Sequence, residues 1–417
     1  MDHHELILFF LQVCVMLSVA LVFGQAMRRL RQPAVLGELM GGIVLGPTVF
    51  GAVMPNVYSR LFPTRDGISL GLEAVIRIGM LFFLFVAGLE VNLAHLKGRG
   101  LSVALTSLLG ILVPFGLGAG SVLWLPDFWG PPAQHKALAF ALLMGAALSI
   151  SALPVIARIL MDLDLIQGDI GVTVMTAATI NDLAGWSLFA VILSTLMPDS
   201  PARSVAGTLG LVVAFSLAIL GLGRWLGRPV LHWLRSFVAW PSGFIGVTAV
   251  LVLVAAALAE TIGIHAIFGA FLVGVALGKG LERENHAHGI IYQFAVSFFA
   301  PLYFVSIGLE ADFAANFDLP IVLLVLFVAC AGKIGGAGLG AWMGGMRPTE
   351  ALAVGFGMNA RGAMEVILAS VALEYRLIDE RIFVALIIMA LLTSMISAPA
   401  LHQLMKTGRP LQRSVSL

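Results

Sequence analysis

One acidic residue stands out because it lies in the middle of a run long and apolar enough to cross a membrane. Asp182 sits in the stretch 176–186, and no Lys or Arg lies within ten positions of it on either side. An ionisable residue inside hydrocarbon costs about 2.5–3.5 kcal/mol even on a lenient scale, so it marks a functional site by default. A buried carboxylate can hold a proton or a cation, and the neighbouring Asn181 and Thr179 offer the oxygen ligands that hard cations prefer.

Two basic residues also lie within apolar runs, and each has glycines beside it. Lys333 occurs in the stretch 330–336 and Arg361 in the stretch 355–362. Glycines around a buried cation indicate an interrupted helix, which membranes tolerate only where protein or a water cavity surrounds the backbone. The stretch from Ser149 through Ser151 to Pro154 predicts a second break, because proline removes a backbone donor. Paired interrupted helices in two halves of a transporter point to its substrate site.

Four other charged residues fall within or near apolar runs, namely Glu38, Glu73, Arg77 and Glu365. Glu73 and Arg77 are four residues apart, a spacing that lets them pair on one helix, and we interpret them as structural. Glu38 lies near the start of its run, where it either ends a helix or lines an entry path.

The composition requires a membrane for these runs. Of 417 residues, 59% are hydrophobic and 11% are charged, and the mean hydropathy is +1.01. Soluble domains are about 45–50% apolar and about 25% charged, so a soluble, disordered or coiled-coil protein is excluded. The net charge of +1 leaves no basic surface for nucleic acid. The two cysteines, Cys14 and Cys330, lie in apolar runs and cannot form a disulfide framework or a metal cage.

Thirteen runs are close to the roughly 20 residues that a membrane helix needs. The first run follows an acidic start, unlike a signal peptide, and is expected to remain as a span. Lys and Arg concentrate in alternate connections, which predicts an N-terminus outside and a C-terminus in the cytoplasm. The connections and the tail are short, so we expect no C-terminal nucleotide-binding domain.

The runs resemble the monovalent cation/proton antiporter superfamily, in particular its second, Kef-type branch. The similarity covers nearly the whole chain, with matching motifs in order at 33–47, 81–90, 181–182, 298–309, 332–333 and 359–362. The resemblance implies an all-α polytopic membrane protein with about 13 spans, inverted repeats and two broken helices that cross. It makes 1–417 one exchanger domain, with a moving core of spans at 101–196 and 319–405. Spans at 5–90 and 241–309 would form the dimerisation scaffold, and 204–223 would link the two.

The resemblance further implies exchange of Na⁺ or K⁺ for H⁺ by a homodimer in the lipid of a bacterial inner membrane, without a cofactor and without enzyme activity. Asp182 would be the shared site. The cation's shell would be completed by Asn181, Thr179 and the backbone near Ser149 and Ser151. The ends of the broken helices, which are partially negative at their C-termini, would be stabilised by charged and polar groups at Lys333, Arg361, Asn359 and Glu365.

One departure bears on stoichiometry, because position 181 is Asn where electrogenic members carry a second carboxylate. One-for-one, electroneutral exchange is therefore expected. The pairing of Arg361 stays open, with Glu365 one turn on as its local candidate. A solute symporter of similar fold and a non-transporting sensor subunit remain alternatives. A membrane enzyme is least favoured, because the chain has no His-Glu-x-x-His run, nucleophile elbow or phosphate-binding loop.

Overall fold

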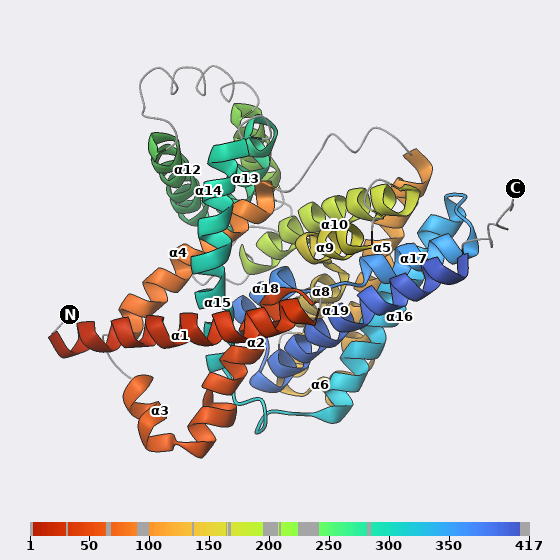
Figure 1. Ribbon diagram of the computed structural model, residues 1–417. Helices are drawn as coiled ribbons and strands as arrows, with labels where there is room; N and C mark the ends of the chain where they lie inside the picture. The colour runs from red at the N-terminus through yellow and green to blue at the C-terminus, as the bar shows by residue number, and fades with distance from the viewer. Residues whose placement is uncertain are drawn as a thin grey trace, which may run out of the picture. The chain divides into compact units, whose positions relative to one another are not determined.

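The computed structural model describes residues 3–30, 32–63, 68–89, 100–135, 137–163, 165, 168–194, 207, 210–223, 242–281 and 285–408 (Figure 1). Every regular element in these ranges is a helix, which confirms the all-α class. Eight of the described helices are long and apolar enough to cross a membrane, and shorter apolar helices accompany them. The expected basic connections at 90–99, 224–241 and 409–417, and parts of the expected linker span at 204–209, lie outside the described residues. The count of thirteen spans stays a prediction.

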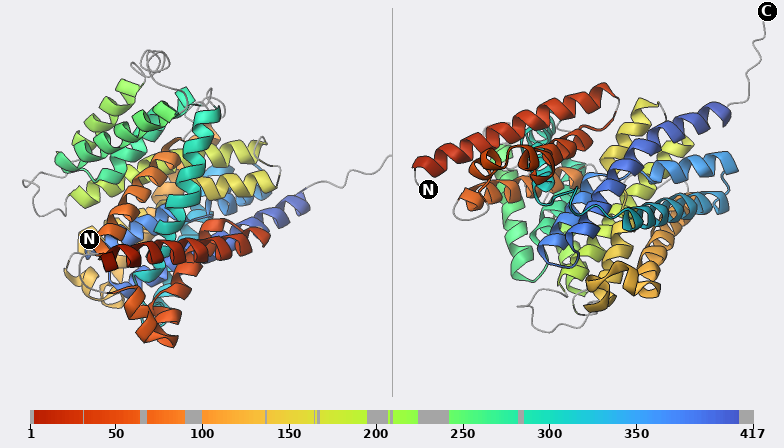
Figure 2. Two further views of the ribbon diagram at one scale, coloured as in Figure 1. Left: turned by 60° about the vertical axis from the view of Figure 1, so that its left-hand side comes forward. Right: turned by 90° about the horizontal axis from the view of Figure 1, so that it is seen from below.

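The chain divides into two compact units, the first comprising Met1–Asn92 and Trp186–Asn316 and the second Leu93–Gly185 and Phe317–Leu417. The roles of scaffold and moving core remain predictions for these parts of the chain. The helices of the first unit are α1 (His3–Arg29), α2 (Ala34–Leu45), η1 (Pro47–Gly51), α3 (Pro55–Leu61), α4 (Ile68–Leu89), the part of α10 (Asp169–Ser194) from Trp186 on, a helix at 210–223, α12 (Ser242–Thr261), α13 (Ala266–Leu281), α14 (Asn285–Phe294), η3 (Ala295–Phe299) and α15 (Ala300–Leu309). Within this unit α1 runs alongside α2 (Figure 2).

The second unit holds both interrupted helices. Its helices are α5 (Gly100–Trp124), α6 (Pro126–Trp129), α7 (Pro131–His135), α8 (Ala137–Ser149), α9 (Leu153–Asp162), α10 (Asp169–Ser194) as far as Gly185, α16 (Leu319–Met343), α17 (Pro348–Met358), α18 (Ala363–Glu374) and α19 (Glu380–Gly408). The apolar run at 136–159 is broken between α8 and α9, and the run at 349–373 is broken between α17 and α18. Both breaks fall where Pro154 and the glycines around Arg361 predicted them. The interruption that the glycines beside Lys333 suggested was wrong, because α16 is continuous through this residue.

Small residues let the helices around these breaks approach closely. At Gly355 of α17, an added Cβ would lie 2.5 Å from the carbonyl oxygen of Ile334 on α16. At Gly332, on the opposite side of α16, it would lie 2.8 Å from the Cα of Pro114 on α5. α16 is thus packed between α5 and α17, which brings Lys333 to the interior of the unit.

Apolar side chains also cover much of the outside of individual helices. Phe10 and Leu21 on α1 are 59% and 68% exposed, and Phe327 on α16 is 71% exposed. Large exposed apolar patches mark surfaces that face a membrane or a partner rather than water. Together with the apolar spans, these surfaces make the protein a multi-pass membrane protein.

Candidate functional site

The two breaks of the second unit contact each other directly. The backbone N–H of Ala152 donates to the carbonyl oxygen of Ala360 at 3.1 Å, and Ser151 Oγ donates to that of Met358 at 3.0 Å. These bonds satisfy backbone groups that a continuous helix would have paired internally. The broken helices therefore meet at a crossing of non-helical segments, each stabilised by the other.

Lys333 is fully buried beside this crossing. Its Nζ donates to the carbonyl oxygen of Gly110 at 3.0 Å and to that of Ser149, the last residue of α8. Asn181 forms hydrogen bonds with all of its polar neighbours when its amide oxygen is turned toward Lys333. That oxygen then accepts a hydrogen bond from Lys333 Nζ at 3.0 Å. An ammonium group has three N–H donors. All three have an acceptor here, and all three acceptors are uncharged.

Asn181 joins the helix that carries Asp182 to its neighbours. In the same orientation its Nδ2 donates to the carbonyl oxygens of Ala177 and Ser107, each at 3.1 Å. Asp182 follows it on α10, is fully buried, and interacts electrostatically with Lys333. The structure thus brings Asp182, Asn181, Ser149 and Lys333 together, although they come from three separate stretches of sequence.

Arg361 lies within the second break and is also fully buried. Its Nη1 donates to Glu365 Oε1 at 2.6 Å and to the carbonyl oxygen of Ala147 at 2.9 Å. Its Nη2 donates to the carbonyl oxygen of Leu148 at 2.5 Å. Glu365 is the local partner that the spacing suggested, and the pair is only 0% and 2% exposed.

The side chains of Lys333 and Arg361 therefore bind the same helix end. The carbonyls of Ala147, Leu148 and Ser149 are among the last four of α8, which have no partner within the helix. The C-terminus of a helix carries a partial negative charge. The Arg361 guanidinium donates to two of these carbonyls, and the Lys333 ammonium donates to the third. Two positive charges from other segments therefore lie at the break in the first interrupted helix.

Ser394 on α19 is a residue of the site that the sequence did not indicate. Its Oγ accepts from the backbone N–H of Arg361 at 3.2 Å and donates to the backbone carbonyl of the same residue. One hydroxyl thus satisfies both backbone groups of the residue that carries the guanidinium. A signal was available, because Thr393, Ser394 and Ser397 interrupt an otherwise apolar span, and all three are fully buried.

The remaining predicted residues lie nearby with different partners. Thr179 is 4% exposed and donates to the carbonyl oxygen of Met175 on its own helix at 2.9 Å. Asn359 is fully buried at the end of α17, and its Nδ2 donates to Cys330 Sγ at 3.6 Å.

The charged residues of the first unit have other surroundings. Arg77 donates to Glu73 Oε1 through Nε and Nη2, at 2.9 and 2.7 Å, and both side chains are about half exposed. This geometry agrees with their structural interpretation. Glu38 is 6% exposed and lies beside Gly24 of α1.

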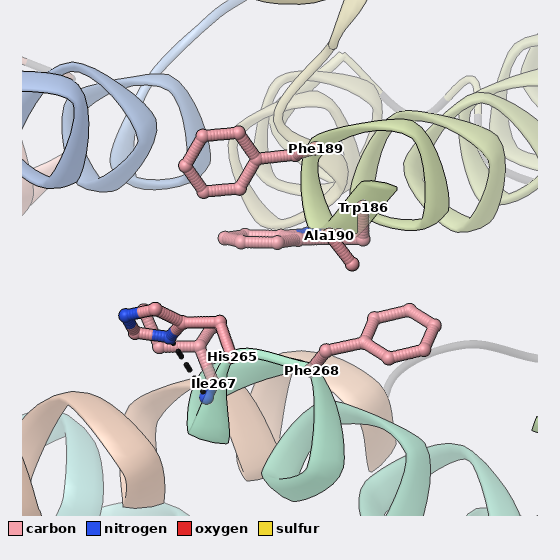
Figure 3. Close-up of a pocket in the computed structure, with 6 residues that line it drawn as sticks. All are labelled: Trp186, Phe189, Ala190, His265, Ile267 and Phe268. Atoms are coloured by element: carbon pink, nitrogen blue, oxygen red, sulfur yellow. Dashed lines mark hydrogen bonds between the residues drawn. The ribbon is translucent and has the colours of Figure 1, made fainter. Parts of the chain in front are cut away.

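A small apolar pocket of the first unit is separate from the crossing. Figure 3 shows Trp186, Phe189 and Ala190 of α10 facing the start of α13. There His265, Ile267 and Phe268 complete the lining of about 170 Å³ of empty space. The lining brings no carboxylate to the pocket among the residues that the structure describes, so its chemistry does not suit a small cation.

Comparison with known proteins assigns the fold and the family. The family described as "Sodium/hydrogen exchanger, transmembrane" matches residues 15–407. The Na(+)/H(+) antiporter NhaS4 of Synechocystis is 31% identical over 402 residues, which are 96% of this chain and 97% of that protein. Cation/H(+) antiporter 18 of Arabidopsis thaliana is 34% identical over 409 residues, which are 96% of this chain and 49% of that protein. This chain therefore spans about half the length of some of its curated relatives and nearly all of others.

A solved structure has the same fold. The sodium proton antiporter MjNhaP1 from Methanocaldococcus jannaschii superposes with a TM-score of 0.69, covering 96% of this chain and 98% of that one, at 18% sequence identity. At that identity the likeness shows the fold alone, while the match over residues 15–407 shows the family. The chain belongs to the sodium/hydrogen exchanger family.

Proposed function

We propose that this protein exchanges a monovalent cation for a proton across the membrane, with Asp182 as the site that both share. The observation that carries the proposal is the position of Asp182. It is a fully buried carboxylate next to Asn181, whose amide is bonded to the lysine that holds the end of α8. A carboxylate at a helix crossing can be neutralised by either a proton or a cation, and this is the chemistry of an exchanger. The names of NhaS4 and of cation/H(+) antiporter 18 agree with this activity.

Alternating access follows from the cost of burying charge. A carboxylate without a bound proton or cation is strongly disfavoured in a low-dielectric barrier. The part of the protein that carries Asp182 would therefore cross the barrier readily only when the site is loaded. Coupling between the two fluxes then arises because one carboxylate serves both ions in turn.

Lys333 supports a one-for-one stoichiometry. A neutral amine would have only two N–H donors for the three oxygens around Nζ, so the geometry favours the ammonium form. If Lys333 and Arg361 keep their charges, loading Asp182 with a proton or with a monovalent cation gives the site the same charge. Exchange is then electroneutral.

The other expected ligands divide into two groups. Thr179, three residues before Asp182, and Ser151 at the crossing can supply oxygens to the cation. The amide oxygen of Asn181 and the carbonyl oxygen of Ser149 are engaged by Lys333. We propose that these two act chiefly by holding Lys333, and that they reach the cation only if the ammonium moves.

The setting of the exchanger is part of the same proposal. Spans 101–196 and 319–405 form the moving core, spans 5–90 and 241–309 form the dimerisation scaffold, and 204–223 links them. The protein works as a homodimer in a bacterial inner membrane, with its N-terminus outside and its C-terminus in the cytoplasm.

The test is exchange in proteoliposomes that contain a pH dye, with Na⁺, K⁺ or Li⁺ added in turn. Wild type is expected to move protons in response to at least one cation, and Asp182→Asn is expected to abolish that response. Asp169→Asn is the matched control, because it removes an exposed carboxylate at the start of the same helix. Exchange by Asp182→Asn at the wild-type rate would exclude Asp182 as the shared site.

A further inference from the structure

Asn359 places a buried amide beside the crossing. The residue follows the last residue of α17, is fully buried, and its Nδ2 donates to Cys330 Sγ. Its Oδ1 has no hydrogen-bond partner among the residues that the structure describes. In this orientation the oxygen is left for a partner other than the described residues.

A buried carbonyl oxygen without a partner is rare, and it points to a water or an ion. Most other oxygens at the crossing are already engaged. Lys333 Nζ donates to the carbonyl oxygen of Ser149 and to the amide oxygen of Asn181. Ser151 Oγ donates to the carbonyl oxygen of Met358. Asn359 Oδ1 is thus a neutral oxygen left available beside the proposed site.

A chain of contacts through α16 links Asn359 to the helix that carries Asp182. Asn359 contacts α16 at Cys330, and Lys333 lies three residues further along, on the same face of the helix. Lys333 in turn bonds Asn181, the neighbour of Asp182. The end of α17 also packs on α10, because a Cβ at Gly357 would lie 3.3 Å from the side chain of Val174.

A competing oxygen nearby suits a cation less well. Glu365 Oε2 is also buried without a partner in the described part of the chain. Its carboxylate is already paired with Arg361 at 2.6 Å, and the positive guanidinium repels a cation.

We propose that Asn359 Oδ1 is a ligand of the transported monovalent cation, shared with Asp182. The inference rests on the proposed function and adds a role that differs from support of the helix break. Because an amide is neutral, this ligand favours the cation over the proton without changing the charge of the loaded site. Asn359 would therefore set cation affinity and selectivity, while Asp182 sets whether exchange occurs.

The experiment compares Asn359→Leu with Asn359→Ser, which keeps an oxygen, and with Thr393→Val. The last removes a fully buried hydroxyl of the same unit whose hydrogen bonds stay within α19. Proton flux driven by Na⁺, K⁺ and Li⁺ gives the apparent KM and the maximum rate. For the cation that drives exchange, Asn359→Leu is expected to raise KM at least tenfold and change the maximum rate less than twofold. Asn359→Ser should lie between Asn359→Leu and wild type, and Thr393→Val should match wild type.

A second measurement separates ligation from folding. Adding the driving cation at constant ionic strength should raise the melting temperature of wild type in detergent, because a ligand that binds the folded state stabilises it. Asn359→Leu should need at least tenfold more cation for the same rise. The inference would be overturned if Asn359→Leu had the same KM as Thr393→Val and the same rise in melting temperature with added cation. Asn359→Leu behaving normally while Asp182→Asn is inactive defeats this inference alone. Activity in Asp182→Asn defeats the proposed function.

Discussion

The two interrupted helices differ in what stabilises their broken ends. The end of α8 offers the carbonyls of Ala147, Leu148 and Ser149, and these accept from a guanidinium and an ammonium group. At the end of α17 and just after it, the carbonyls of Met358 and Ala360 accept instead from a serine hydroxyl and a backbone amide.

This difference shows that two similar breaks can be stabilised by different means. Full positive charges counter the helix dipole at α8, and they come from segments about two hundred residues away in the chain. Hydrogen bonds to charged groups contribute about 1.5–3 kcal/mol, against about 0.5–1.5 kcal/mol for neutral ones. We therefore expect the structure to depend more on the charged groups at α8 than on the neutral ones at α17.

The largest effect is expected from Arg361→Met. The change leaves Glu365 buried without its partner, and removing one member of a buried pair costs about 3–5 kcal/mol. The melting temperature in detergent should fall clearly, and transport should fall with it. The double variant Arg361→Met with Glu365→Gln is the control, because it removes both charges and should regain part of the lost stability. An unchanged melting temperature in the single variant would show that the ion pair has no structural role.

A smaller loss is expected from Lys333→Met. Three uncharged oxygens lose their donor, each at a cost of about 1–3 kcal/mol, whereas Arg361→Met takes the donor from two such carbonyls and from a buried carboxylate. The melting temperature and the rate of exchange in proteoliposomes should both fall, and the melting temperature should fall less than in Arg361→Met. A larger fall in stability than in Arg361→Met would reverse the ranking of the two cations.

The smallest effect on stability is expected at the end of α17, where the stabilising groups are uncharged. Ser151→Ala removes one hydrogen bond to Met358, which is worth about 1 kcal/mol. The melting temperature should shift only slightly. Because we also propose the Ser151 hydroxyl as an oxygen ligand of the cation, the apparent KM for the driving cation should rise in the same liposomes. An unchanged apparent KM would show that Ser151 only holds the crossing and does not bind the cation.

The breaks and the buried charges could be predicted from sequence because each has a local cause. Pro154 and the glycines around Arg361 limit helix continuity wherever they occur, and a charge within an apolar run is visible without a fold. The pairing of Arg361 with Glu365 is local too, since one helical turn separates them. Spacing alone did not show burial, however, because Glu73 and Arg77 have the same spacing and are half exposed.

The partners of Lys333 could not be predicted in this way. Gly110, Ser149 and Asn181 lie 152 to 223 positions before it in the chain, so only the packing of α5, α8 and α10 around α16 brings them together. The same holds for Ser394, which reaches Arg361 from another helix. Long-range hydrogen bonds depend on tertiary geometry, of which a single sequence carries little record.

An imposed membrane potential tests whether one carboxylate serves both ions in turn. Proton flux driven by the transported cation is followed in proteoliposomes while the potential is set by a method that does not use that cation. A potential of 100 mV is worth about 2.3 kcal/mol per charge moved, so an electrogenic cycle would respond plainly. Neither the flux nor its equilibrium end point is expected to shift with the potential. A shift would contradict one-for-one exchange at Asp182, and loss of that shift in Lys333→Met would identify the lysine as a second proton carrier.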